Sequence, residues 1–159
     1  MSSSPEKLIQ ALQARLQALE DKEAIRSVLN QYCIRPDAHD FSGYAELYVE
    51  DGTMGFEQWG DVTGREAIAK TCAAESVYEG LLHIMTNMEI TLDGPDRASA
   101  SARVWFCATP KVSELEVNYA FGGPYKFTFI KRHDGWKINT MKLKKVWSMG
   151  QDTEGVFTK

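Results

Sequence analysis

Two residues combine reactive side chains with positions that suit a pocket. Asp37 directly follows Pro36, which is predicted to end a helix because the residue before a proline disfavours the helical region. Its carboxylate is therefore predicted to project into the mouth of a pocket. Burial raises the pKa of a carboxyl group and lets it act as a base near neutrality. The alternative is a structural aspartate, since aspartate before a helix is common.

His83 opens an alternating stretch, residues 83–92, and can exchange protons because an imidazole changes charge near about pH 6.5. Alternation places it on the more polar face of that strand, opposite the apolar residues. The residues that share its parity are Met85, Asn87 and Glu89. That face is predicted to be either the polar wall of a pocket or an outer surface.

A cation and several aromatic residues are candidates for binding a substrate beside this pair. Arg35 can stabilise negative charge on a substrate oxygen, or it is simply a cation favoured at a helix C-terminus. Most aromatic residues are predicted to be core, and a subset is predicted to line a flat, apolar pocket. Trp105 faces either the ligand or a partner subunit. The residues assigned to substrate binding are Arg35, Tyr48, Phe56, Trp59, Trp105 and Tyr125.

These residues are positioned by helices that precede a long β region. Helical spacing begins at residue 6, with a restart predicted at Asp21 and a stop at Pro36. Asp40 is predicted to cap a second helix that ends at Gly52, and a third helix runs over residues 64–77. A short strand pair is expected around residues 54–59. Longer strands are predicted at residues 83–92, 97–109, 125–131 and 136–147, with breaks at 93–96, 122–124 and 133–135.

Composition bounds the function. The 159 residues suit one domain, with a core over about residues 6–147 and loose termini. The net charge of −4 comes without a basic stripe, which argues against a nucleic-acid partner. The three cysteines form no cluster, so no metal site is predicted and a cytoplasmic location is expected. No apolar run suggests a membrane span, and no phosphate loop or dinucleotide motif suggests a cofactor.

The order of these elements, together with several short stretches, resembles the SnoaL-like family of the nuclear-transport-factor-like cone superfamily. The resemblance covers roughly residues 16–147 and rests on the combination of stretches rather than on any one of them. The fold that it implies is α+β, a cone-shaped curved antiparallel sheet with N-terminal helices packed over its concave face, enclosing one pocket. The matching stretches are residues 19–26, Asp37 with Asp40 and Phe41, residues 47–52, residues 64–68, His83 with Met88, and residues 134–138.

The resemblance also implies site residues. In scytalone dehydratase, an enzyme of this superfamily, an aspartate and a histidine at the places of Asp37 and His83 lie in the active site. A second active-site histidine of that enzyme would fall near Cys107 or Ala108, where this chain has none. Dehydration by this chain would therefore need another acid. Epoxide opening is disfavoured, because Trp105 occupies the place of an aspartate that the epoxide hydrolases need.

These observations predict a cofactor-independent lyase or isomerase of secondary metabolism, with Asp37 and His83 as its catalytic residues. The reaction would be cyclisation, dehydration or double-bond isomerisation of an apolar or aromatic polyketide-, terpenoid- or alkaloid-like molecule. The alternative is a non-catalytic binding or assembly domain, because one fold carries many functions. The family also implies a homodimer that buries the uncovered surface of the sheet.

Overall fold

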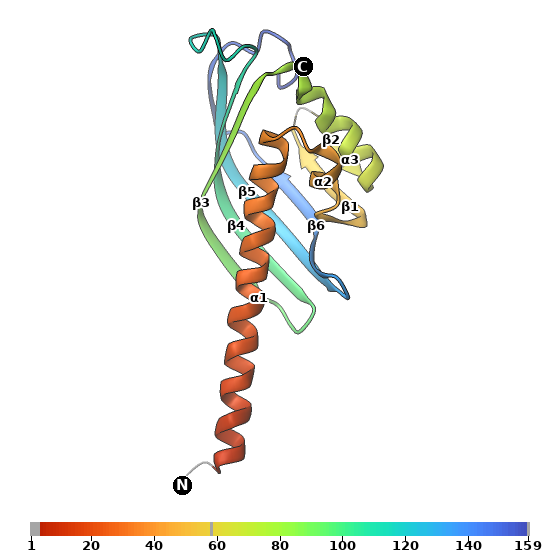
Figure 1. The fold of residues 1–159 in the computed structure, drawn as a ribbon, viewed down its shortest axis with the longest axis vertical. Coiled ribbons are helices and arrows are strands. Elements are labelled where there is room, and N and C mark those ends of the chain that lie inside the picture. The colour runs from red at the N-terminus through yellow and green to blue at the C-terminus, as the bar shows by residue number, and fades with distance from the viewer. Residues whose placement is uncertain (1–3, 58, 159) are drawn as a thin grey trace.

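The computed structural model describes residues 4–57 and 59–158 (Figure 1). The helices precede most of the strands in the chain. The helices are α1 (Pro5–Asp37), α2 (Phe41–Ala45), α3 (Arg65–Cys72) and the 3-10 helix η1 (Ala73–Val77). The strands are β1 (Tyr48–Phe56), β2 (Gly60–Thr63), β3 (Gly80–Leu92), β4 (Arg97–Thr109), β5 (Tyr119–Arg132), β6 (Gly135–Leu143) and β7 (Trp147–Gly150).

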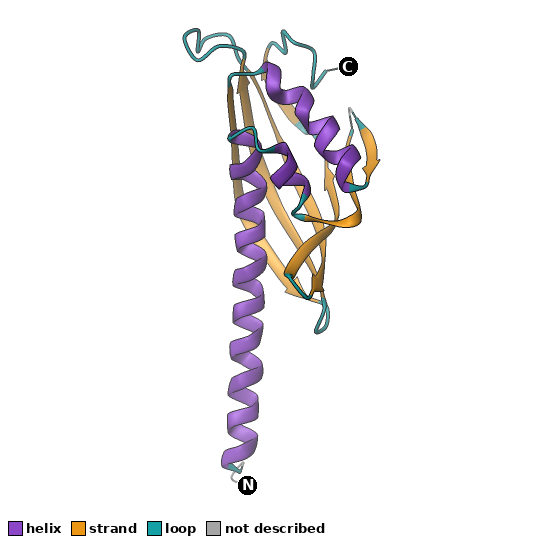
Figure 2. Cartoon of the chain, turned by 45° about the vertical axis from the view of Figure 1, so that its right-hand side comes forward, coloured by secondary structure: helices purple, strands orange, loops and turns teal. Residues whose placement is uncertain are grey.

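The strands form one curved sheet in the order β2-β1-β6-β5-β4-β3, with β7 paired to β5. Helix α1 packs along this sheet against β3 and β6. Helix α2 contacts α1, and α3 packs against α2, so both short helices lie near the C-terminal end of α1 (Figure 2). The predicted α+β class, with a curved sheet covered by N-terminal helices, is thereby confirmed. The sheet is mixed rather than wholly antiparallel, because β1 runs parallel to β6.

Helix α1 is one continuous helix of 33 residues, so the predicted break at Asp21 is wrong. Asp21 is buried within the helix, where it accepts hydrogen bonds from Lys131 Nζ (2.6 Å) and Trp136 Nε1 (2.9 Å). Asp21 therefore docks the helix on the sheet. Residues 5–17 are all exposed and extend beyond the sheet (Figure 1). No described helix has a segment that is both long and apolar enough to cross a membrane.

The predicted stop at Pro36 is off by one residue, since α1 ends at Asp37 with Pro36 inside its last turn. Asp40 caps α2 as predicted, because its Oδ1 accepts from the Gly43 backbone N–H at 2.9 Å. The predicted end of α2 at Gly52 is wrong, since α2 stops at Ala45 and Tyr48 already begins β1. Aromatic and β-branched residues favour a strand there, and pairing with β6 outweighs the helical spacing.

The predicted chain break at residues 122–124 is also wrong, because these residues lie within β5. Glycine is required at two of them by close approaches. A Cβ on Gly122 would lie 2.4 Å from Trp147 Nε1, and one on Gly123 would lie 1.8 Å from the Lys144 carbonyl oxygen. The segment after β6 therefore crosses directly over β5, and the predicted last strand divides into β6 and β7.

Strand β3 contains a bulge that reverses its alternation. The pairing of β3 with β4 shifts between Thr86 and Glu89, and Asn87 adopts a left-handed backbone with φ of 53°. Before the bulge His83 lies on the inner face, while Leu82 and Ile84 are exposed. After it, the apolar residues of even number turn inward. Odd-numbered residues therefore face inward before Asn87, and even-numbered residues face inward after it.

The C-terminal tail, predicted to be loose, is packed against the core. Phe157 is 1% exposed and lies within the aromatic core. Asp152 organises the tail, since its carboxylate accepts from the backbone N–H groups of Val156 and Phe157 and from the hydroxyl of Tyr78. Residues 1–3 of the predicted loose N-terminus lie outside the described residues.

Candidate active site

Asp37 and His83 are in direct side-chain contact where the end of α1 meets β3. Asp37 Oδ1 lies 2.6 Å from His83 Nδ1. The same carboxylate also accepts from the His83 backbone N–H, at 3.1 Å to Oδ1 and 3.0 Å to Oδ2. The Asp37 side chain is 22% exposed and that of His83 is 10% exposed. The two backbone contacts therefore fix the carboxylate, and the contact with Nδ1 orients the imidazole ring.

This geometry decides which imidazole nitrogen can react. A carboxylate is an acceptor, so it favours the tautomer of His83 with the hydrogen on Nδ1. That tautomer leaves a lone pair on Nε2, which can take a proton from a ligand. Asp37 also stabilises the imidazolium that then forms. The pair therefore has the arrangement of a general base with a carboxylate that orients it.

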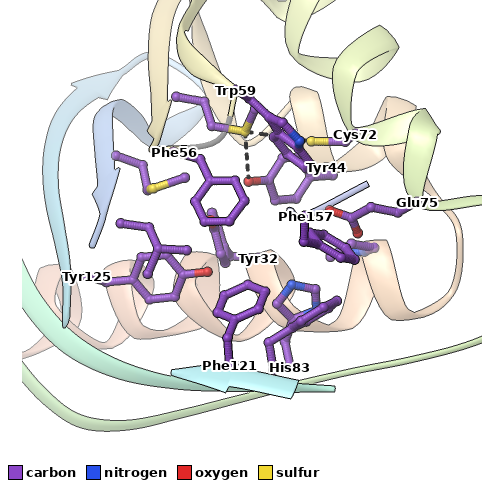
Figure 3. A pocket seen from close by; sticks show the side chains of 15 residues that line it. Tyr32, Tyr44, Phe56, Trp59, Cys72, Glu75, His83, Phe121, Tyr125 and Phe157 are labelled. Carbon is purple, nitrogen blue, oxygen red and sulfur yellow. Dashed lines mark hydrogen bonds between the residues drawn. The ribbon is translucent and has the colours of Figure 1, made fainter. Parts of the chain in front are cut away.

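His83 lines a partly enclosed cavity between the helices and the sheet (Figure 3). Most of its wall is apolar or aromatic, which suits a flat, poorly soluble ligand. Of the described residues that line it, His83 carries the one imidazole and Glu75 the one carboxyl group. The lining residues are Tyr32, Pro36, Tyr44, Met54, Phe56, Trp59, Cys72, Glu75, His83, Phe106, Phe121, Tyr125, Met141, Leu143 and Phe157.

The cavity is nearly filled by its own side chains. Its empty space is about 410 Å³ when the open mouth is included, but the centre of a water molecule can move through only about 30 Å³ of it. Trp59 and Phe157 stack with ring centroids 6.0 Å apart, and Trp59 Nε1 donates to the Val156 carbonyl oxygen at 3.0 Å. A ligand larger than a few atoms must therefore displace side chains such as these.

Three tyrosine hydroxyls contribute polar groups to this apolar wall. Burial raises the pKa of Tyr32, Tyr44 and Tyr125, so each hydroxyl stays protonated and can donate a hydrogen bond. The Tyr44 hydroxyl is 3.1 Å from that of Tyr48. The Tyr125 hydroxyl points into the cavity from the side opposite Glu75 (Figure 3). These groups can orient a carbonyl or enolate oxygen.

Glu75 is a cavity residue that the sequence analysis missed. It lies on η1, is 6% exposed, and its Oε2 is buried with no hydrogen-bond partner among the described residues. Burial raises its pKa to about 7. The spacing carried a signal that was not used: Glu75 continues the i, i+4, i+7 series of Ile68 and Cys72, the buried residues of α3, whereas the exposed Glu66 lies outside that series.

The structure brings five of the sequence-predicted site residues to this cavity. Asp37 and His83 form the pair described above, although Asp37 stands behind His83 and does not itself line the cavity. Phe56, Trp59 and Tyr125 lie in its wall. The predicted proximity of Asp37 and His83 thus agrees with the geometry, and their catalytic roles stay predictions.

Three other predicted binding residues lie elsewhere. Arg35 pairs with Asp40 at 3.0 Å and joins α1 to α2 outside the cavity. Tyr48 is fully buried behind Tyr44 and supports its hydroxyl. Trp105 is 54% exposed on the outer face of the sheet, where it packs edge-on against Trp147. None of the three lines the cavity.

The described residues contain no group of three or more histidine, cysteine, aspartate or glutamate side chains placed to hold a metal ion. The chemistry that the cavity offers with its own side chains is acid–base chemistry. His83 can accept a proton, Glu75 can donate one, the tyrosine hydroxyls can donate hydrogen bonds, and the aromatic wall can hold a flat ligand.

Several solved structures share this fold at low sequence identity. A scytalone-dehydratase-like protein from Novosphingobium aromaticivorans superposes with a TM-score of 0.78 and 21% identity, covering 86% of this chain and 91% of the other. A protein with a cystatin-like fold from the same organism gives 0.73 and 24%, covering 93% and 95%. A LinA-type hexachlorocyclohexane dehydrochlorinase from Novosphingobium barchaimii gives 0.74 and 16%, covering 87% and 95%. At such identities these likenesses show the fold alone.

Sequence comparison identifies the family more directly. No curated protein matches the chain significantly. The sequence profile of the SnoaL-like domain, however, matches residues 17–142, which include α1 from its thirteenth residue, both members of the Asp37–His83 pair and all but the last residue of β6. The match spans most of the chain, and the chain belongs to the SnoaL-like family.

Proposed function

We propose that this protein is a cofactor-independent lyase or isomerase in which His83 acts as the general base. The observation that carries the proposal is the 2.6 Å contact of Asp37 Oδ1 with His83 Nδ1, on the wall of an aromatic cavity. The fixed tautomer directs the lone pair of Nε2 at whatever the cavity holds. Asp37 is the positioning residue and His83 the catalytic one.

The reaction begins at a carbon acid. His83 Nε2 removes a proton from a carbon next to a carbonyl group, and the electron pair of that bond moves toward the carbonyl oxygen. The Tyr125 hydroxyl, which stays protonated because burial raises its pKa, donates a hydrogen bond to that oxygen. The resulting enolate can expel a β-substituent, close a ring or take the proton back at another carbon.

The apolar wall of the cavity suits a flat, largely apolar substrate, and we infer a polyketide-, terpenoid- or alkaloid-like intermediate from it. Relatives of the same fold lend support, since the names of the scytalone-dehydratase-like and dehydrochlorinase proteins denote loss of water and of hydrogen chloride. Both losses can start with removal of a proton from carbon.

One observation favours the alternative of a non-catalytic binding or assembly domain. The interior leaves about 30 Å³ in which a water molecule can move, which is far less than a polyketide needs. Ligand titration separates the two functions. A binding domain would take up aromatic ligands without any proton exchange at carbon, whereas the enzyme would exchange protons with the ligands that it binds.

Deuterium exchange into a panel of cyclic and aryl ketones tests the proposal without knowledge of the natural substrate. The wild-type protein is expected to accelerate exchange at the carbon next to the carbonyl. His83→Gln and Asp37→Asn should each lower that rate about 10²–10⁴-fold, the contribution of a positioned acid or base. Asp93→Asn, on an exposed turn, is the control and should change nothing. Exchange that persists in His83→Gln would refute the assignment.

A further inference from the structure

We propose that Glu75 is the general acid of the same cavity and donates its proton to a departing oxygen. The inference rests on the proposed function of His83 and adds what that function leaves open, namely how the leaving group departs. It also narrows the substrate class to carbonyl compounds with a hydroxyl group on the β-carbon.

The first support is the position of Glu75. Its side chain points into the cavity on the same side as His83 (Figure 3), and its residue is 6% exposed. Oε2 is buried and has no hydrogen-bond partner among the described residues. A buried polar atom without a partner costs free energy, so it indicates a group that a ligand or a water molecule satisfies. A substrate hydroxyl is such a partner.

The second support is the surroundings of the carboxyl group. The titratable groups that face it are His83 from β3, Asp37 from α1, Cys72 from α3 and Tyr125 from β5. Burial raises the pKa of Glu75 to about 7, the Asp37 charge adds to the rise, and His83 opposes it. Glu75 is therefore protonated over part of the neutral range and able to give its proton away.

Glu75 is also the strongest acid that the cavity wall offers. Burial raises the pKa of Cys72, and it raises the pKa of Tyr125 well above the usual range of a phenol. Both groups therefore give up a proton much less readily than Glu75. Asp37 is occupied by three contacts with His83. The chain lacks a histidine near residue 107, so no imidazole takes this role from β4.

The step balances with these two groups alone. His83 Nε2 takes the proton from the α-carbon, and the electron pair of that bond becomes the new carbon–carbon double bond. The bond from the β-carbon to oxygen breaks, and its electron pair takes the Glu75 proton, so that water leaves. His83 is then positive and Glu75 negative. Transfer of the proton from His83 to Glu75, directly or through water, restores both groups.

This arrangement separates dehydration from dehydrohalogenation. Chloride is a stable anion and leaves without a proton, so its loss needs only a base. Hydroxide is a poor leaving group and needs an acid. A buried carboxylic acid beside the base is costly for a halide-eliminating site, because the acid would then be an unpaired polar group with no task. The geometry therefore favours an oxygen leaving group.

A pair of matched probes tests this inference. One is an aryl ketone with a β-hydroxyl group, and the other is the same ketone with chlorine in place of the hydroxyl. Glu75→Gln is expected to lower water loss from the first about 10²–10⁴-fold. Chloride loss from the second and deuterium exchange should change by no more than a few fold. Glu66→Gln, an exposed glutamate on α3, is the matched control and should leave all three rates unchanged.

The outcomes separate the two proposals. If exchange does not depend on His83, the proposed function fails, whatever Glu75 does. If exchange depends on His83 but Glu75→Gln leaves water loss unchanged, the Glu75 inference fails alone. If Glu75→Gln lowers both eliminations and exchange equally, Glu75 supports the cavity structurally and is not the acid.

Infrared spectroscopy reports the protonation state of Glu75 directly and needs neither a substrate nor a measurement of activity. The carbonyl stretch of a protonated carboxylic acid should be present in the wild-type protein at pH 6 and disappear as pH rises through about 7. It should be absent from Glu75→Gln at pH 6 and above, where the other carboxyl groups are ionised. A wild-type spectrum without this band at pH 6 overturns the inference even if neither ketone reacts. A melting curve confirms that the variant is folded.

Discussion

Asp37 Oδ1 and His83 Nδ1 lie 2.6 Å apart although 46 residues separate them in the chain. The contact joins the last residue of α1 to the fourth residue of β3. Helix α1 packs along β3, and Asp21 ties the same helix to the sheet further down. The position of the carboxylate is therefore set by a rigid helix docked at two levels, which keeps the imidazole orientation fixed before a ligand arrives.

The tautomer of His83 should depend on Asp37. In the wild-type protein we expect the hydrogen on Nδ1, because the carboxylate accepts it. An asparagine at position 37 can offer its amide nitrogen instead, which favours the tautomer with the hydrogen on Nε2 and removes the reactive lone pair. Nitrogen NMR of labelled imidazole should show this change in Asp37→Asn. An unchanged tautomer in the variant would contradict the role given to Asp37.

The free energy of unfolding should depend on pH in a way that reflects the raised pKa of Glu75. The folded-state pKa of about 7 lies above the unfolded value near 4.5, so the folded state holds the proton more tightly. The stabilisation that this gives is fully present below about pH 4.5 and is lost as pH rises through about 7. The full size of this stabilisation is roughly 3–4 kcal/mol, the difference between the two pKa values converted to free energy.

Denaturant unfolding of wild type and Glu75→Gln between pH 4.5 and pH 8 measures this difference. Because the other carboxyl groups titrate in both proteins, only the difference between the two free energies of unfolding is diagnostic. The advantage of wild type should shrink as pH rises and then level off. A constant difference across the range would mean that Glu75 does not titrate there.

Phe157 should be worth more to stability than a residue near a chain end usually is. It is 1% exposed and contacts the rings of Trp59, Tyr78, Phe106, Tyr119 and Phe121. Phe157→Ala should lower the free energy of unfolding by about 3–5 kcal/mol, as for other buried phenylalanines. Gln151→Ala, an exposed residue of the same tail, is the control. Similar melting temperatures for both variants would show that the tail is not part of the core.

Removal of residues 1–16 should leave the domain folded. Residues 5–17 are exposed and add length to α1 without contacting the sheet core, and the buried part of α1 begins at Asp21. The far-ultraviolet helical signal should fall while the melting temperature stays within a few degrees. A large fall in melting temperature would show that the apolar side chains of this segment, Leu8, Ile9, Leu12 and Leu16, are covered by another molecule.

The homodimer predicted from the sequence stays a prediction, and the outer face of the sheet is where we expect it. Trp105 is exposed there beside its β-ladder partner Ile84 and near Leu82. Contiguous exposed apolar residues of this kind mark contact surfaces. Trp105→Lys should shift a dimer toward monomer in light scattering, and Thr91→Lys, exposed elsewhere on β3, should not. A monomeric wild type at micromolar concentration would refute the prediction.

The sequence predicted the parts of the fold that local patterns encode. Asp40 is a helix cap because its side chain accepts a hydrogen bond from a nearby backbone N–H. The strand over residues 97–109 carries apolar residues at every second position from Ala98 to Phe106, and these positions are buried. Both signals are local, and both agree with the structure. Asp21 and the 122–124 segment were mispredicted because their roles are set by distant partners, Lys131 and Trp136 for the first and Trp147 for the second.

The candidate site was partly predictable for a similar reason. Asp37 and His83 were singled out by residue type and by resemblance, and the structure places them in contact. Alternation could not decide which way His83 points, because the bulge at Asn87 reverses the pattern from which the decision would be made. Phe157 escaped notice because its burial comes from tertiary packing, which leaves no periodic trace in its own segment. Glu75 escaped notice because it is a charged residue, although it follows the buried Ile68 and Cys72 at helical spacing.

The bulge at Asn87 has a consequence for comparing this chain with its relatives. Two homologous strands that differ by one bulge residue have the same inner face but different residue counts along it. An alignment without a gap would then pair cavity-facing positions of one protein with solvent-facing positions of the other on one side of residue 87. Such an alignment would then compare residues that face the cavity with residues that face solvent. An alignment to a relative that lacks the bulge therefore needs a one-residue gap at position 87.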